Sequence, residues 1–318
     1  LSMIHRTTIM NVLFSVVLPI FALVAAGWAA RRYGYLGPEG ARELNQFVVY
    51  LGMPALLFQI MANASWHDLY QPGFAMAFGL GCAVTYGVTV YVRLRQGAPL
   101  ADASLDGLNG GYANVGFIGF PLCLAAFGPQ SLPLVTITAI LTVSVLFGVA
   151  VLLVEIGLQP KGNMKAIMGK VAISLAKNPM LLAPVLGVLY AAFAPALPAG
   201  PNRFLGLLAS AASPCALVSL GAFIGDCHGS FNWPRVSALV AFKLVFQPLV
   251  TWIIAAFVFG LPHELTAIAV VVSALPTGTG PYMLANLYKR DAGTTAGSIL
   301  TSTLLSVATI AILISLFK

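Results

Sequence analysis

Two short stretches interrupt long apolar segments of this sequence and carry its best candidates for binding chemistry. They cover residues 114–121 and 276–281. Glycine lowers helix propensity and proline lacks a backbone donor, so both stretches predict a broken helix. Within a bilayer, the freed backbone groups must be buried in protein or line a wet cavity. The candidate binding residues are Asn114, Gly116, Gly119 and Pro121, followed by Thr277, Gly278, Thr279 and Pro281.

These residues favour binding of a small anion. The Asn114 amide offers two donors and one acceptor, which can hold a carboxylate or cap the following half-helix. The hydroxyls of Thr277 and Thr279 can coordinate an anion or a cation, or bond back to their own helix. Half-helix N-termini carry partial positive charge, so an anion is the natural cargo where two such ends meet.

Three further residues enter the candidate site. Lys243 is the one charged residue well inside an apolar segment, and it predicts either carbonyl binding at the breaks or direct cargo contact. Ser213 and Ser219 flank Pro214 and are weaker candidates for cargo contact. No Asp or Glu is expected near the middle of the membrane, which lowers the odds of a proton relay. No cofactor or metal is expected, and Na+ or H+ as coupling ion stays open.

Composition requires a membrane to surround this chain. Hydrophobic residues make up 59% and charged residues 8% of the sequence, against about 25% charged residues in a soluble domain. Apolar segments predict ten membrane-spanning helices, and residues 159–178 predict an amphipathic helix at the membrane surface. The spans are expected at about 11–30, 45–61, 72–92, 102–127, 132–155, 179–193, 203–224, 234–259, 264–288 and 294–317.

The ten spans divide into two similar halves. The same separation of 160 residues relates five pairs, namely Pro179 − Pro19, Pro198 − Pro38, Pro214 − Pro54, Pro281 − Pro121 and Gly187 − Gly27. Repeated matches at one separation predict a duplication. Because each half holds five spans, the second copy enters from the opposite side and the repeat is inverted. The expected units are residues 1–158, a cytoplasmic connector at 159–178, and residues 179–318.

Basic residues predict the orientation. Of the 16 Lys and Arg residues, twelve fall on one side of the predicted topology, three (Arg6, Arg203 and Lys318) fall on the other, and Lys243 lies within a span. The positive-inside rule places the richer side in the cytoplasm and both termini outside the inner membrane. This distribution along short loops does not fit a nucleic-acid groove.

Several motifs resemble the auxin efflux carrier family, in its bacterial branch often labelled malonate or malate transporters. The similarity covers nearly the whole chain, and its marks are residues 45–58, 114–121, 243–248, 274–285 and 302–306. The resemblance implies two inverted five-helix repeats, with the fourth and ninth helices crossing at unwound centres. It also implies elevator-type movement of small organic anions and a homodimer. Many members carry an Asn in the second crossover, where this chain has Gly280.

The predicted function is therefore secondary transport of a short dicarboxylate such as malonate or malate. Carriers of auxin-like monocarboxylic acids or amino acids, or an anion channel, remain alternatives. An enzyme is not expected, because a mid-span His, an Asp pair and a Gly-x-Ser-x-Gly motif are all missing from the sequence. A primary pump is equally disfavoured, since there is no phosphate-binding loop.

Overall fold

The computed structural model describes residues 12–65, 70–158, 168–169, 172–173, 176–194, 197–226 and 231–317. All regular secondary structure in these ranges is helical. Seven of the helices are long and apolar enough to cross a membrane, namely Leu13–Arg32, Pro38–Asn63, Pro72–Arg95, Pro129–Leu158, Ala199–Asp226, Trp233–Val258 and Ala292–Phe317. The predicted surface helix at 159–178 lies mostly outside the described residues.

The two glycine- and proline-containing stretches each separate two shorter helices. The first follows α7 (Leu100–Gly111) and leads into a π-helical turn, η3 (Val115–Gly119), and then α8 (Phe120–Phe127). The second separates α16 (His263–Ser273) from α17 (Gly280–Leu287). A further short apolar helix is α12 (Pro179–Phe193).

Prolines explain four of the π-helical turns. A proline cannot donate a backbone bond and its ring clashes with the carbonyl four residues earlier, so an α-helix cannot continue unchanged through it. In each case the helix widens for one turn and the proline follows two residues after the turn ends. The helix thus passes the proline without ending. The four turns are η1 (Leu13–Val17), η2 (Val48–Gly52), η3 and η6 (Phe242–Phe246).

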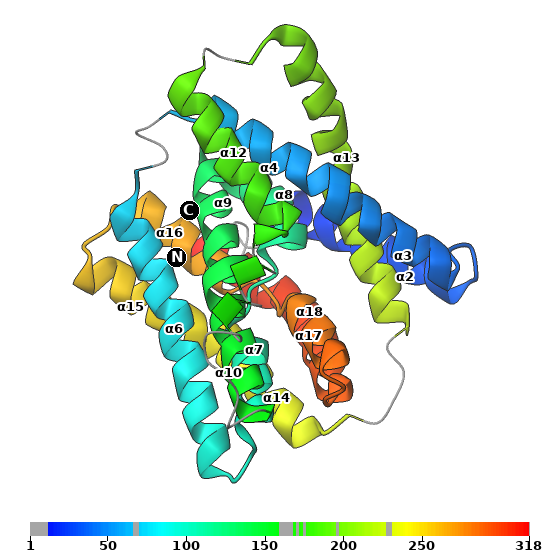
Figure 1. Ribbon diagram of the computed structural model, residues 1–318, viewed down its shortest axis with the longest axis vertical. Coiled ribbons are helices and arrows are strands. Elements are labelled where there is room, and N and C mark those ends of the chain that lie inside the picture. Colours follow the sequence, from blue (N-terminus) through cyan, green and yellow to red (C-terminus); the bar gives the residue numbers. More distant parts are fainter. Residues whose placement is uncertain are drawn as a thin grey trace.

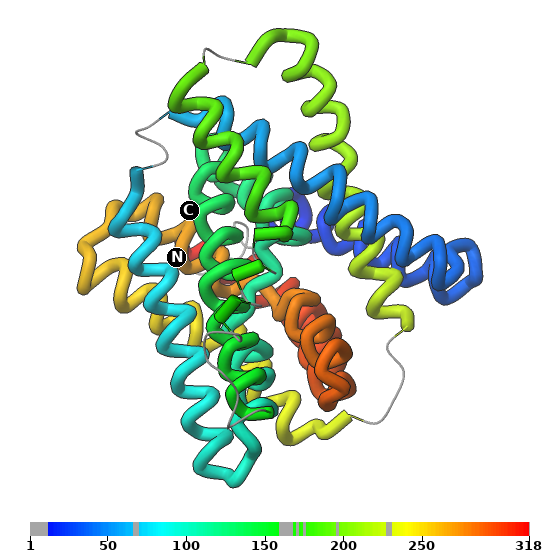
Figure 2. Tube along the Cα trace, in the orientation of Figure 1, coloured from blue at the N-terminus to red at the C-terminus, as the bar shows by residue number. Residues whose placement is uncertain are grey.

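The helices form two neighbouring groups (Figures 1 and 2). In the first, α2 (Leu18–Arg32) packs on α13 (Ala199–Asp226), and α12 packs on α4 (Met53–Asn63). The other group contains both interrupted helices together with α6 (Pro72–Arg95), α10 (Phe147–Leu158), α14 (Trp233–Ala241), α15 (Gln247–Ile253) and α18 (Ala292–Phe317).

Glycines set how closely the helices of the first group approach. A Cβ added at Gly27 of α2 would lie 2.1 Å from the Val218 carbonyl oxygen of α13. A Cβ added at Gly187 of α12 would lie 2.7 Å from the Phe58 oxygen of α4. Without a hydrophobic force between helices in lipid, such small-residue contacts permit the close packing that holds spans together.

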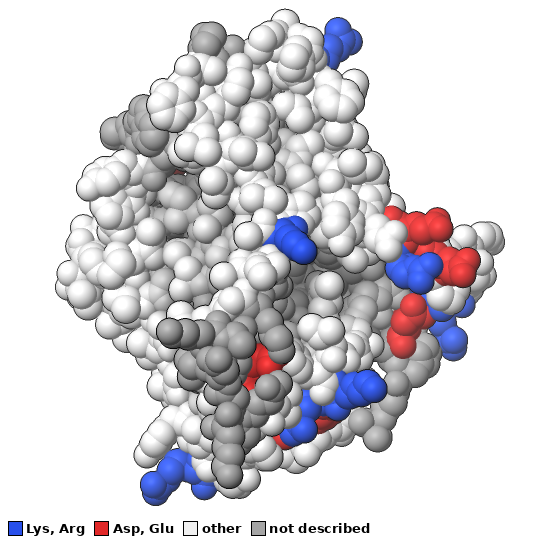
Figure 3. Space-filling model, in the orientation of Figure 1, with Lys and Arg blue, Asp and Glu red and all other residues white. Residues whose placement is uncertain are grey.

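Charged side chains gather at one end of the molecule. Most of the face in Figure 3 is uncharged, and the blue and red groups lie mainly toward its lower right. The described basic residues at this end lie in the last turns of α2 and α6, within the helix at Pro38–Phe47, in the first turn of α14 or just before α18. We call this end the arginine-rich end. Its basic residues are Arg31, Arg32, Arg42, Arg93, Arg95, Arg235, Lys289 and Arg290.

Candidate functional site at the two helix breaks

The two breaks lie against each other through backbone hydrogen bonds. An isolated antiparallel bridge joins Ala113 to Thr277. The Asn114 N–H donates to the Pro276 carbonyl at 2.9 Å, and the Gly278 N–H donates to the Tyr112 carbonyl at 3.0 Å. Backbone groups released by the broken helices are therefore partly satisfied by each other, as a protein interior in a membrane requires.

Asn114 uses its two amide atoms differently. Its Oδ1 accepts from the Phe117 N–H at 3.4 Å and so caps the π-helical turn that follows. Its Nδ2 is buried and has no hydrogen-bond partner among the described residues, while the whole residue is only 4% exposed. An unpaired buried donor costs free energy, so this amide is a ready binding group.

Asn114 is also among the residues that line a cavity of about 240 Å³. Its wall includes residues of the first break, the start of α17 and Tyr112. We call it the crossover cavity, and it is lined by Asn45, Val49, Tyr112, Ala113, Asn114, Val115, Gly116, Phe117, Val143, Phe147, Asn178, Met180, Thr279, Gly280 and Met283. Amide, hydroxyl and glycine groups thus face an otherwise apolar space, as is typical of small-molecule sites.

Thr277 and Thr279 have different surroundings. Thr277 is fully buried. Its hydroxyl donates to the Asn109 carbonyl at 2.8 Å, and its N–H donates to the Ser302 hydroxyl at 3.0 Å. Thr277 therefore ties the second break to α7 and α18 and lies outside the cavity lining. Thr279 lines the crossover cavity.

The predicted glycines and prolines act through the backbone. A Cβ at Gly278 would lie 2.9 Å from the Tyr112 ring, and a Cβ at Gly280 would lie 2.7 Å from it, so the ring occupies the space beside both glycines. Gly116 lines the cavity, whereas a Cβ on Gly119 would meet Leu275 at 3.1 Å. Pro281 falls in the first turn of α17, where no donor is required. Pro121 lies within a continuous helix, and the preceding turn η3 accommodates it.

Lys243 supports the ends of both interrupted helices. The side chain is fully buried, and its ammonium donates to the Ser273 carbonyl, at the end of α16, at 2.5 Å. It also donates to Gln247 Oε1 at 2.6 Å. The Gln247 amide in turn donates to the Gly111 carbonyl, at the end of α7, at 3.0 Å. A positive charge here complements the negative end of the α16 dipole.

A second cavity, of about 260 Å³, adjoins the first. Four residues line both cavities: Asn45, Phe117, Thr279 and Met283. Ser219 lines this second cavity, but Ser213 belongs to neither lining. Arg42 and Asp226 lie at the arginine-rich end, so we call this space the arginine-end cavity. Its lining is completed by Pro38, Ala41, Leu220, Phe223 and Tyr282.

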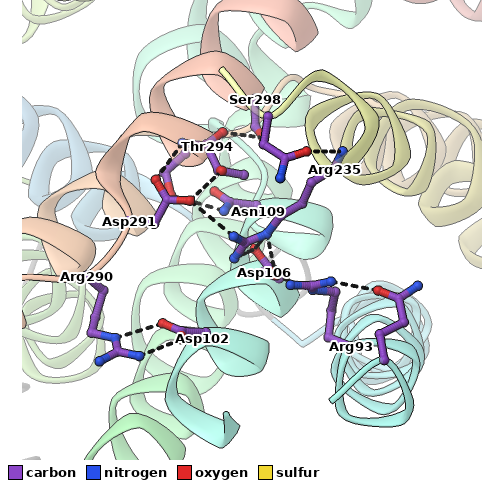
Figure 4. A network of polar contacts seen from close by, with 12 residues as sticks. Arg93, Asp102, Asp106, Asn109, Arg235, Arg290, Asp291, Thr294 and Ser298 are labelled. Carbon is purple, nitrogen blue, oxygen red and sulfur yellow. Dashed lines mark hydrogen bonds and ion pairs between the residues drawn. The ribbon is translucent and has the colours of Figure 1, made fainter. Parts of the chain in front are cut away.

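One buried acidic residue was not singled out from the sequence. Asp106, in the second turn of α7, is fully buried, whereas the expectation for Asp and Glu concerned only the middle of the membrane. Its carboxylate accepts from Arg93 Nε at 2.6 Å and from Arg235 Nη2 at 2.7 Å (Figure 4). Buried charges persist when they are paired and hydrogen-bonded, so Asp106 ties α6, α7 and α14 together.

The same network reaches the start of α18. Arg235 Nη1 also pairs with Asp291 at 3.1 Å, and Arg290 forms a two-point contact with Asp102 (Figure 4). Burial opposes ionisation of Asp291, but hydrogen bonds from Thr294 and Gly293 and the charge of Arg235 together lower its pKa. The carboxylate is therefore ionised at neutral pH and fixes the start of α18.

Sequence reasoning missed three residues of this region. Tyr112 and Asn45 line the crossover cavity, and Gln247 links Lys243 to α7. Gln247 could have been found, because it lies four residues after Lys243 and shares its helix face. Tyr112 lies two residues before Asn114, but only the fold shows that its ring covers the glycines of the second break.

Comparison with known proteins points to transport. A family model described as membrane transport protein matches residues 12–314. A Rhizobium meliloti protein named "Putative malonate transporter" is 27% identical over 309 residues, covering 95% of each chain. An uncharacterized transporter of Methanocaldococcus jannaschii is 26% identical over 308 residues, covering 93% of this chain and 96% of the relative. One from Escherichia coli K12 is 23% identical over 285 residues, covering 86% and 88%.

Proposed function

Since this chain belongs to the membrane transport protein family, that of the auxin efflux carriers, and is a multi-pass membrane protein, we propose that it is a secondary transporter of small organic anions. Its substrate is a short dicarboxylate of the malonate or malate type. The name of the Rhizobium meliloti relative supports this class of substrate. The substrate site is the crossover cavity between the two helix breaks.

The observation that carries this proposal is the unpaired Asn114 Nδ2 beside a cavity. An amide donor there suits a carboxylate oxygen, and it can bind without disturbing the cap that Oδ1 provides. Thr279 and the start of α17 lie in the same lining. The positive ends of the half-helices add attraction for an anion without requiring a basic side chain.

The proposed architecture is ten spans in two inverted repeats of five, residues 1–158 and 179–318, linked by residues 159–178. Two contacts related by the 160-residue separation support it. Gly27 meets Val218, while Gly187 meets Phe58. Adding 160 to Gly27 gives 187 and subtracting 160 from Val218 gives 58, so each contact is the counterpart of the other. A repeat related by a two-fold axis in the membrane produces such reciprocal pairs.

Alternating access then follows from relative movement of the two helix groups. The group formed by α2, α3 (Pro38–Phe47), α4, α12 and α13 acts as a scaffold. The group that contains both breaks moves as the elevator and carries the substrate. We further propose a homodimer in the inner membrane, with the arginine-rich end in the cytoplasm and both termini outside. Na+ and H+ are the candidate coupling ions.

Reconstitution into proteoliposomes tests this function. Uptake of radiolabelled malonate should saturate with concentration, and imposed Na+ or pH gradients identify the coupling ion. Asn114→Asp keeps the acceptor that caps η3 but replaces the unpaired donor with negative charge. We expect it to reduce uptake about 100-fold or more, since a donor is lost and an anion is repelled.

A matched variant separates binding from folding. Asn232 caps α14 by accepting from the Arg235 N–H at 3.3 Å and lies outside the crossover cavity. Asn232→Asp makes the same chemical change at another helix start and should preserve uptake. Both variants should unfold at temperatures near that of the wild type. Normal malonate uptake by Asn114→Asp would exclude the crossover cavity as the site.

A further inference from the structure

The arginine-end cavity adjoins the crossover cavity, and each lining includes polar side chains that the other lacks. Asn45 and Thr279 line both spaces, so polar side chains lie where the two cavities meet. Farther out, Arg42 contributes to the wall of the arginine-end cavity alone. The polar lining thus runs from an amide at the helix breaks to a guanidinium at the outer part.

Arg42 and Asn45 are placed on one face of one helix. Both belong to α3, and residues three apart on a helix are neighbours. The helix continues through η2 into α4, because the π-helical turn accommodates Pro54. A continuous helix holds the pair in fixed positions relative to the crossover cavity.

The charges around Arg42 leave its guanidinium available for a ligand. Within the described ranges, no hydrogen bond or ion pair is made by Arg42. Asp226 faces the same cavity from α13, but its carboxylate accepts from Arg31 Nε at 2.6 Å. Glu39 and Glu43 are its acidic neighbours along α3 itself. Arg42 is therefore the basic side chain of this cavity lining.

We propose that Arg42 and Asn45 form a second carboxylate-binding position, which selects dicarboxylates over monocarboxylates. This inference rests on the proposed function, in which Asn114 binds the first carboxylate. Asn45 contacts the ligand where the two cavities join, and Arg42 pairs with the distal carboxylate. A guanidinium matches the two oxygens of a carboxylate, and such charge-assisted bonds are strong.

The test measures selectivity in proteoliposomes. Uptake of labelled malonate and labelled pyruvate, a dicarboxylate and a monocarboxylate, is compared for the wild type and Arg42→Gln. We expect the KM for malonate to rise about tenfold or more, with little change in the KM for pyruvate. Arg42→Lys should retain part of the preference, because the charge remains but the two-point geometry is lost. Asn45→Leu should reduce the same preference by a smaller factor.

Arg95→Gln is the matched control. Arg95 lies in the last turn of α6 at the same end of the molecule and lines neither cavity. Arg95→Gln should leave the preference for malonate over pyruvate unchanged, although it removes the same charge as Arg42→Gln. A malonate-to-pyruvate preference that is unaltered in Arg42→Gln, whether both rates fall or neither does, would overturn the second position. Failure of the first position is distinguishable, because Asn114→Asp would then transport both anions normally.

Discussion

The first helix break holds a buried side-chain donor without a hydrogen-bond partner among the described residues, whereas Thr277 of the second break bonds to neighbouring helices. Asn114 leaves a buried donor unpaired beside the crossover cavity. Thr277 has both its hydroxyl and its N–H engaged, with α7 and α18 respectively. The two breaks are joined by backbone bonds. Among the described residues of the two breaks, the fully buried donor without a partner belongs to the first break, and Thr279 of the second break lines the cavity.

This difference shows that two interrupted helices joined by backbone bonds can use their polar side chains differently. The second break can contribute Thr279 and the positive end of α17 to an anion while Thr277 maintains the joint. Binding and structural support are therefore assigned to different threonines of the second break. Lys243 and Gln247 add support, since Lys243 bonds to the end of α16 and Gln247 to the end of α7.

The largest expected loss of stability comes from Lys243→Met. The substitution removes the donor to the Ser273 carbonyl and to Gln247 Oε1, leaving two buried acceptors unpaired at about 1–3 kcal/mol each. Relief of the buried charge offsets part of this cost. We expect a clear fall in the unfolding temperature of the detergent-purified protein and loss of malonate uptake.

Gln247→Met tests whether Lys243 and Gln247 stabilise the ends of α16 and α7 independently. It removes the donor to the Gly111 carbonyl and should destabilise the end of α7 in the same assay. Because Lys243 and Gln247 are hydrogen-bonded to each other, the double variant should lose less stability than the sum of the two losses. Strict additivity would show that the two helix ends are held independently.

A smaller effect is expected from Thr277→Val, which preserves shape and removes the hydroxyl donated to Asn109. One lost buried hydrogen bond costs about 1–3 kcal/mol. The maximal rate of malonate uptake should fall while its KM stays near the wild-type value, because Thr277 lies outside the cavity lining. A large rise in KM without loss of stability would instead assign Thr277 to binding and remove the contrast between the breaks.

Much of the arrangement at the breaks follows from local sequence. Glycines and prolines at 114–121 and 276–281 interrupt helices for reasons that depend on backbone donors and sterics alone. Asn114 was expected either to cap or to bind, and the structure gives each of its amide atoms a separate environment. Lys243 was expected to bond carbonyls near the breaks, and it does so at Ser273.

Partners brought together by tertiary packing could not be predicted in this way. Thr277 is satisfied by Asn109 and Ser302, which are distant in sequence, so its environment is fixed only when three helices meet. Asp106 is buried because Arg93 and Arg235 arrive from other helices to pair with it. Hydrophobic periodicity and local helix propensity contain no information on contacts between residues of different helices.

The smallest effect tests the close contact between the Tyr112 ring and the glycines of the second break. A Cβ at Gly280 would lie 2.7 Å from Tyr112 Cζ, so Gly280→Ala must displace the ring. Overpacking costs about 1–3 kcal/mol, and a ring edge beside a cavity can yield, which favours the lower figure. We expect a modest fall in the unfolding temperature and a several-fold fall in malonate uptake.

Combining variants identifies the clash as the cause. Tyr112→Leu removes the ring atoms that a Cβ at Gly280 would meet. Gly280→Ala should therefore lower malonate uptake less in the Tyr112→Leu background than in the wild type. Gly87→Ala provides the matched control, because no atom lies within 4 Å of a Cβ added at that position in α6. Equal losses from Gly280→Ala with and without the Tyr112 ring would mean that Gly280 serves the ligand or the backbone directly. Gly280 would then join Thr279 in the binding role of the second break.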